Sequence, residues 1–268
     1  MPVYKDQCNR DVVMATPPQK IISLVPSQTE LLYDLGLRNE VIGITKFCVH
    51  PNEWFTCKTR IGGTKNVQVE RIKSLQPDLI IANREENVKE QVELLAQDFP
   101  VWVSDINNLE DALQMIRSIG VVTSTSSQAE NIIQKIKAGF EMLAAGTNVL
   151  LKICYLIWKD PYMTVGGDTF INDMLLRCGM DNVFKQYFRY PSISLADIKE
   201  QNPQLIMLSS EPYPFKEKHL QELQLYFPKA KIVLVNGEMF SWYGSRLQIA
   251  ASYFKTLINT FYDNPPGK

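Results

Sequence analysis

The sequence predicts an α/β protein of two lobes, each with a mainly parallel sheet flanked by helices, joined by one long central helix. Three observations lead to this prediction. Strand-like and helix-like patterns alternate along the chain, and the strands are nearly continuous apolar runs, which is typical of parallel sheets covered on both faces. A segment of the first half recurs in the second half, and one long amphipathic stretch lies near the middle of the chain.

The central stretch runs from Ser127 to Gly146. Its apolar residues recur at steps of three and four, which places them on one stripe of an α-helix. Ser127 with Glu130 three residues later forms a capping-box pattern, and Gly146 suits the left-handed residue that ends a helix. About nineteen residues at 1.5 Å each would give a rod of roughly 28 Å. The residues of the stripe are Ala129, Ile132, Ile133, Ile136, Phe140 and Leu143.

The recurring segment occupies residues 70–81 and, at a constant offset of 126, residues 196–207. Each copy has the pattern of a short helix, stopped by a proline, that leads into a buried strand. A second repeat pairs Leu32 and Gly36 with Leu175 and Gly179 at a different offset, so the two halves carry unequal insertions. The pattern indicates an internal duplication. The residue types shared at the first offset are those of Ile72, Lys73, Pro77, Leu79 and Ile80.

The remaining elements follow in order between turn and capping signals. Ser27, with Glu30 three residues on, is expected to cap the first helix. The expected division is an extended lead-in over 1–19, an N-terminal lobe over 20–123, the interlobe helix over 124–147 and a C-terminal lobe over 148–268. Expected strands lie at 20–25, 40–44, 79–82, 101–103, 150–158, 163–165, 205–208 and 231–235, and further helices at 27–36, 87–97, 109–119, 169–177, 216–226 and up to about 261.

Composition narrows the function classes. The 268 residues are 45% hydrophobic and 21% charged, enough to bury real cores, and the net charge is −1. No sequence-independent attraction to nucleic acid or an anionic membrane is therefore expected. No apolar run reaches the ~18–20 residues of a membrane span. The first twenty residues lack the pattern of a secretory signal, so the expectation is either a cytoplasmic protein or a processed start.

Signatures of catalysis and of metal binding are missing. The five cysteines form no C-x-x-C pair and no zinc-type spacing. Cys154 and Cys178 are expected as buried thiols, and Cys48 and Cys57 are close enough in sequence to bridge one loop. None of the dinucleotide, P-loop, serine-hydrolase or zinc-protease motifs occurs. Of the two histidines, His219 lies in a charged helix pattern and is expected to be solvated.

Aromatic and polar residues gather instead where strands are expected to end. Ligands of parallel α/β sheets bind outside the carboxyl ends of the strands, and flat rings such as Trp242 and Tyr243 suit a large conjugated molecule. The alternative is that these rings pack between the lobes. His50 has three open roles, because an imidazole can ligate iron or cobalt, donate to a carboxamide, or cap the turn before Pro51.

Four segments resemble a known family. KIISLVPSQTELLYDLGL, VIGITKFCVHP, VQVERIKSLQPDLIIA and GEMFSWYGSR are similar to the substrate-binding proteins of cobalamin, haem and ferric-siderophore ABC importers, and among them most to the cobalamin-binding members. The resemblance spans roughly residues 20–260. It implies the class III fold of two α/β lobes on one long helix, and a location in the periplasm or cell envelope, with the cytoplasm as the alternative.

The resemblance also implies site residues. Relative to the cobalamin-binding members, His50 replaces a tyrosine, Tyr190 a tryptophan and Thr64 another aromatic residue. Glu70 and Asp197 match the acidic residues that meet arginines of the membrane permease, with Glu200 as an alternative to Asp197. The expected ligand-binding residues, including those added from the strand-end loops, are Phe47, Cys48, His50, Thr64, Lys65, Arg84, Trp158, Tyr190, Glu238, Phe240, Trp242, Tyr243 and Arg246.

The expected function is a monomeric receptor that holds a corrinoid between its lobes and delivers it to an ABC importer, without catalysis and without a resident cofactor. A haem receptor is the first alternative and would use His50 or a tyrosine as axial ligand to the iron. A siderophore receptor would use cations such as Lys65, Arg84 and Arg246. From another class, a cytoplasmic chelatase-like enzyme would require clustered cysteines or paired carboxylates.

Overall fold

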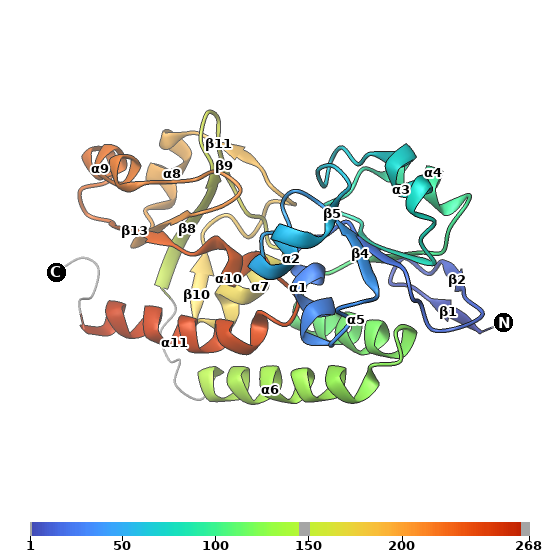
Figure 1. Cartoon of the computed structure of the whole chain (residues 1–268). Helices are drawn as coiled ribbons and strands as arrows, with labels where there is room; N and C mark the ends of the chain where they lie inside the picture. Colours follow the sequence, from blue (N-terminus) through green and yellow to red (C-terminus); the bar gives the residue numbers. More distant parts are fainter. Residues whose placement is uncertain (1, 145–150, 264–268) are drawn as a thin grey trace. The chain divides into compact units, whose positions relative to one another are not determined.

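The computed structural model describes residues 2–144 and 151–263, and the chain divides into two compact units (Figure 1). Unit 1 contains the residues up to Ile106, Glu110–Lys135 and Tyr243–Arg246. Unit 2 contains Asn107–Leu109, Ile136–Trp242 and the residues from Leu247 onward. The predicted α/β class with mainly parallel sheets and flanking helices is confirmed. Within the described residues, no helix is both long and apolar enough to cross a bilayer.

The sheet of unit 1 has the strand order β5-β4-β3-β6-β7, and every neighbouring pair is parallel. All residues of β3, β6 and β7 are buried, as expected for a sheet covered on both faces. The strands are β3 (Ile21–Ser23), β4 (Val41–Ile44), β5 (Thr59–Arg60), β6 (Leu79–Asn83) and β7 (Val101–Ser104), and the helices that follow them along the chain are α1 (Pro26–Asp34), α2 (Asn52–Cys57), α3 (Val69–Leu75), α4 (Lys89–Ala96) and α5 (Leu109–Val122).

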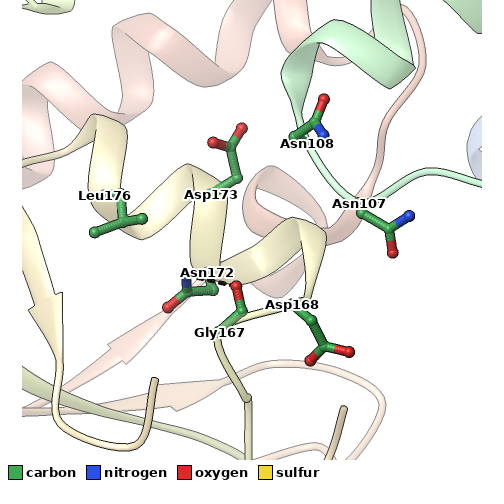
Figure 2. A pocket seen from close by; sticks show the side chains of 7 residues that line it. All are labelled: Asn107, Asn108, Gly167, Asp168, Asn172, Asp173 and Leu176. Atoms are coloured by element: carbon green, nitrogen blue, oxygen red, sulfur yellow. Dashed lines mark hydrogen bonds between the residues drawn. The ribbon is translucent and has the colours of Figure 1, made fainter. Parts of the chain in front are cut away.

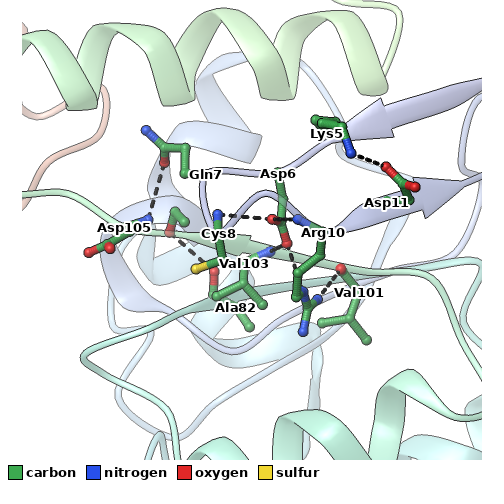
Figure 3. Close-up of polar contacts among 11 residues, drawn as sticks. Lys5, Asp6, Gln7, Cys8, Arg10, Asp11, Ala82, Val101, Val103 and Asp105 are labelled. Atoms are coloured by element: carbon green, nitrogen blue, oxygen red, sulfur yellow. Dashed lines mark hydrogen bonds and ion pairs between the residues drawn. The ribbon is translucent and has the colours of Figure 1, made fainter.

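The start of the chain is more ordered than the predicted extended lead-in. An antiparallel hairpin of β1 (Val3–Lys5) and β2 (Asp11–Val13) is attached to unit 1 through its turn (Figure 3). The buried carboxylate of Asp6 accepts hydrogen bonds from the backbone N–H groups of Cys8 and Arg10 within the turn, and from that of Val103 on β7. The polar composition of residues 1–19 does not reveal this hairpin, because its turn is attached to β7 by the buried carboxylate of Asp6 and not by an apolar side chain.

The sheet of unit 2 has the order β11-β9-β8-β12-β13, and β10 also pairs with β8. Strands β8, β10, β12 and β13 pair in parallel with one another, while β9 runs antiparallel to β8 and to β11. The elements are β8 (Leu151–Trp158), β9 (Tyr162–Thr164), α7 (Phe170–Arg177), β10 (Met180–Asn182), β11 (Ser192–Ile193), α8 (Leu195–Gln201), β12 (Leu205–Ser209), α9 (Glu217–Tyr226), β13 (Lys231–Val235), α10 (Gly237–Ser241) and α11 (Leu247–Asp263).

The structure confirms the repeat at offset 126. Helices α3 and α8, like strands β6 and β12, begin and end at matching positions. Both helices end in a left-handed residue, Gln76 at φ 48° and Asn202 at φ 47°. Two residues further on, the matching side chains of Asp78 and Gln204 play similar parts. Asp78 accepts a hydrogen bond from the backbone N–H of Lys20, just before β3, and Gln204 accepts one from that of Lys152 in β8. The two copies therefore share their capping geometry as well as their apolar pattern.

The central helix α6 spans Ser126–Ala144. All six residues of its predicted apolar stripe are buried. Ser127 is the second residue of the helix and not its cap, and the carboxylate of Glu130 accepts hydrogen bonds from Arg117 and Gln134. The helix contributes Ser126–Lys135 to unit 1 and Ile136–Ala144 to unit 2. Gly146, the predicted end, lies outside the described residues.

The predicted cap of the first helix is wrong. Helix α1 begins at Pro26 with Val25 as its N-cap, and no side chain caps it. Proline is well suited to the first helical position because its missing N–H needs no partner there. Glu30 is consequently released from the expected capping box, and it pairs with Arg246 instead.

Candidate functional site

The loop after β4 presents Phe47 to solvent. The ring is 51% exposed and lies against Gly63, where a Cβ atom would come within 3.2 Å of it. Cys48, expected to line the site, is instead fully buried. Its sulfur lies 3.1 Å from the hydroxyl oxygens of Thr29 and Thr45, and burial raises the pKa of the thiol. Cys48 thus fastens the base of the loop that carries Phe47.

His50 is half-buried in the same loop and lies close enough to Glu30 to act electrostatically on its carboxylate. Among residues 2–144 and 151–263, no three histidine, cysteine or acidic side chains gather in a metal-binding arrangement. Ligation by His50 of the metal in a bound ligand, such as the iron of haem, therefore remains a prediction. Cys48 and Cys57 are free thiols, one buried and one exposed.

The turn before α3 depends on glycine. Gly62 has φ +101°, and a Cβ atom there would come within 2.5 Å of the Asn66 carbonyl oxygen. Thr64 follows, half-buried, and its carbonyl accepts a hydrogen bond from Asn87. Lys65 is exposed, and its ammonium group donates to the carbonyl of Glu85.

Arg84 follows β6 and is exposed. Its guanidinium pairs with Asp105, with Nη1 and Oδ2 2.6 Å apart. Like Lys65, this expected ligand-binding cation is already engaged by a neighbouring group in the structure.

The segment Tyr243–Arg246 is buried within unit 1. The Tyr243 hydroxyl donates to the carboxylate of Glu86, and Arg246 makes a bidentate ion pair with Glu30 at 2.7 and 2.9 Å. Burial raises the pKa of Glu30, although the Arg246 charge opposes the shift. Two of the expected ligand-binding residues are therefore held by carboxylates inside unit 1.

In unit 2, Trp158 stands at the carboxyl end of β8 and is 40% exposed. Its ring meets the ring of Tyr213 edge to face, with centroids 5.6 Å apart. Behind Tyr213 lies His219, which the charged sequence pattern predicts to be solvated and which is in fact buried. Its Nδ1 accepts a hydrogen bond from the backbone N–H of Lys216 at the start of α9. The aromatic neighbours explain the burial, because they come from the loop before the helix and not from the charged helix itself.

Three further expected residues lie in or next to α10. Phe240 is fully buried, with its ring 4.6 Å from that of Phe254 and 5.3 Å from that of Tyr155. Trp242 is also buried and donates its indole N–H to the carboxylate of Glu211. These two rings pack unit 2, while Glu238 in the first turn of α10 stays half-buried.

Tyr190, in the loop before β11, is half-buried, and the Arg189 guanidinium lies 5.6 Å from the centre of its ring. This loop follows β10. In the same unit, a hollow of about 450 Å³ opens beside α7 (Figure 2). In the sequence, Gly167-Asp168 is visible only as the turn after a strand. The hollow is lined by Asn107, Asn108, Gly167, Asp168, Asn172, Asp173 and Leu176.

The expected docking residues are both exposed, but they are not equivalent. Glu70 lies in the first turn of α3, and its match at offset 126 is Ala196. Asp197 closes a capping box with Ser194 at the start of α8, and these hydrogen bonds lower the pKa of its carboxyl. Asp197 therefore has a local structural role that Glu70 lacks, and Glu200 is exposed on the same helix.

Comparison with known proteins places this geometry among binding proteins. The model of the periplasmic binding protein family matches residues 21–226. A vitamin B12-binding protein of Pectobacterium carotovorum is 27% identical over 87% of this chain and 86% of its own length.

Two solved structures share the fold. The periplasmic vitamin B12-binding protein BtuF of Vibrio cholerae has a TM-score of 0.79 and 20% identity, over 92% of this chain and 99% of its own. The periplasmic haem-binding protein RhuT from Roseiflexus has the same TM-score and identity, over 91% and 98%. At such identities the likeness concerns the fold alone.

Proposed function

Because the chain belongs to the periplasmic binding protein family, we propose that it binds a corrinoid and delivers it to an ABC importer without catalysing a reaction. The observation that carries this proposal is the match to a vitamin B12-binding protein over 87% of the chain. The proposal places the protein in the periplasm or cell envelope, as a monomer.

Within each unit, exposed aromatic rings at or after the ends of strands support a large, flat ligand. Phe47 and Trp158 are 51% and 40% exposed, and Tyr190 is half-buried. Covering such rings with an apolar macrocycle stabilises the complex by about 25 cal/mol per Å² of apolar surface removed from water. Cys48, a buried member of the expected set, would hold the base of the loop that carries Phe47.

Haem is the second candidate ligand, because a haem-binding protein shares the fold as closely as BtuF does. His50 would then be the axial ligand to the iron. His50→Ala should abolish the shift of the Soret band on haemin binding if the imidazole ligates the metal. An unchanged shift would remove that role from His50.

The experiment that separates the ligands is a visible-absorbance titration of the purified protein with cyanocobalamin, cobinamide and haemin. The proposal predicts saturable binding of both corrinoids, with dissociation constants in the micromolar range or tighter. Saturation by haemin alone would replace the corrinoid with haem, and no binding of any of the three would contradict both candidates.

Delivery to a permease would use exposed acidic residues. Charge reversal at Glu70 should weaken docking to the permease while corrinoid affinity stays the same, because the side chain is exposed on α3 and has no capping role. Asp197→Arg is a less clean test, because it also breaks the capping box of α8. A Glu70 variant that delivers ligand as well as the unmodified protein would contradict the docking role.

A further inference from the structure

Phe188, in the loop between β10 and β11, is 80% exposed. It is more exposed than Phe47 or Trp158, which are two of the aromatic residues expected to contact ligand. Phe184, which precedes it in the same loop, is buried and contacts the ring of Tyr187 at 6.0 Å. The loop therefore carries two phenylalanine side chains, and only one of them is packed.

The backbone around Phe188 is fixed on both sides. The N–H of Gly166 donates to the carbonyl of Arg189 at 2.6 Å, and the N–H of Gly167 donates to the carbonyl of Tyr187 at 3.0 Å. In return, the N–H of Arg189 donates to the carboxylate of Asp168 at 2.6 Å. Three hydrogen bonds thus hold the residues before and after Phe188 on the turn that follows β9.

This close approach requires glycine. A Cβ atom on Gly166 would come within 2.3 Å of the Tyr187 carbonyl oxygen, and one on Gly167 within 2.2 Å of the Lys185 carbonyl oxygen. Arg189 also adopts a left-handed conformation, with φ 53°, which costs a non-glycine residue free energy. The backbone next to Phe188 thus requires glycine at positions 166 and 167 and an unfavourable conformation at Arg189.

The Arg189 side chain completes the attachment. Its Nη1 donates to the side chain of Asn107 at 3.1 Å and to the carbonyl of Asp168 at 3.3 Å. Asn107, Gly167 and Asp168 also line the hollow of unit 2 (Figure 2). The residues on either side of Phe188 are therefore bound to the rim of that hollow.

A single exposed phenylalanine is ordinary on a protein surface. An exposed ring on a fixed backbone is better suited to binding than one on a flexible loop. The backbone is already ordered in the free protein, so less conformational entropy is lost when a ligand binds. We propose that Phe188 is a ligand-contacting residue that packs on the apolar face of the corrin macrocycle, and that Asp168 is the residue that positions it. This inference rests on the proposed corrinoid function.

Phe188→Ala should weaken the binding of cyanocobalamin and of cobinamide by the same factor, roughly fivefold or more, because both ligands contain the macrocycle and an aromatic contact contributes about 1 kcal/mol. Phe188→Tyr should stay within about twofold of the unmodified protein, since it keeps the ring. The matched control is Leu225→Ala on α9, where an 84% exposed apolar side chain is removed away from the loop, and its affinity should not change. Thermal unfolding should be alike for all of these variants.

Affinity of Phe188→Ala equal to that of the unmodified protein would overturn the inference while leaving the corrinoid function intact. A loss for cyanocobalamin but not for cobinamide would also overturn it, because the contact would then lie with the nucleotide portion of the ligand. Failure of the unmodified protein to bind either corrinoid would instead remove the proposed function itself.

The positioning role has its own test. Asp168→Ala should weaken corrinoid binding, and in the Phe188→Ala background it should cause no further loss, because residues that act through one contact are not additive. Losses that multiply in the double variant would show that Asp168 acts independently of Phe188, which would overturn its assignment as a positioning residue.

Discussion

At the scale of single residues, exposure separates the rings available to a ligand from the rings that support the fold. Trp158 and Trp242 were both expected to contact ligand. The structure leaves the first 40% exposed, and it buries the second next to α10 with its indole N–H bound to Glu211. The type of residue and its place after a strand are visible in the sequence, but the direction in which its side chain points depends on packing partners that are distant along the chain.

This difference gives a paired prediction. Trp158→Ala should weaken corrinoid binding by about 1 kcal/mol, the typical value of an aromatic contact, with little change in the free energy of unfolding. Trp242→Ala should lower the free energy of unfolding by about 3 kcal/mol or more, because it opens a cavity. Calorimetric titration and denaturant unfolding measure the two effects. The same loss of stability in both variants would contradict the separation.

His219 gives a prediction for pH. Burial lowers the pKa of its imidazole, Lys159 and Lys218 add to the shift, and Glu222 opposes it. The unfolded chain therefore binds a proton at a higher pH than the folded chain does. Stability should fall as pH decreases from about 6.5, the ordinary pKa of histidine, towards the lower pKa of the folded state.

His219→Gln is the suitable variant, because its amide oxygen can still accept the N–H of Lys216 while the side chain cannot titrate. Denaturant unfolding of both proteins between about pH 5 and 8 should show a weaker pH dependence for the variant. Parallel curves would assign the pH dependence to other groups.

At the scale of elements, the repeat predicts how two helix ends respond to substitution. Gln76 and Asn202 hold matching left-handed positions at the ends of α3 and α8. Glycine adopts this conformation without a steric cost, whereas for other residues it costs about 1 kcal/mol, and asparagine tolerates it better than most.

Gln76→Gly should therefore raise the free energy of unfolding by up to about 1 kcal/mol, and Asn202→Gly by a smaller amount. Denaturant titrations of the two variants against the unmodified protein measure both changes. A larger gain at Asn202 than at Gln76 would contradict the explanation.

Strands, helices and the repeat could be predicted from sequence because each depends on local periodicity. The apolar stripe of α6 and the paired segments at offset 126 are examples, and both hold in the structure. Helix caps were less predictable. The Ser27–Glu30 pattern is a sound local signal for a capping box. In the structure, however, Glu30 pairs with Arg246, which lies 216 residues away. Such a distant partner cannot be predicted from a local sequence pattern.

At the scale of the whole molecule, the family and the general class of function could be predicted, whereas the division of roles within the site could not. The four family segments are spread over most of the chain, and the family match over 21–226 overlaps the first three of them. The same segments mix buried and exposed residues, as Phe47 and Cys48 show side by side. In the sequence, Phe188 is one of three aromatic residues within 187–190 and has no local feature that sets it apart. Its fixed backbone depends on Gly166, Gly167 and Asp168, which lie about 20 residues earlier in the chain.

Corrinoid binding is the property on which the proposed role of this chain depends. It can be measured by calorimetric titration with cyanocobalamin at several temperatures, with haemin titrated alongside. We expect saturation at one corrinoid per chain, with a dissociation constant in the micromolar range or tighter and a negative change in heat capacity from apolar burial. Saturation by haemin together with no measurable heat from cyanocobalamin would show that the chain is not a corrinoid receptor.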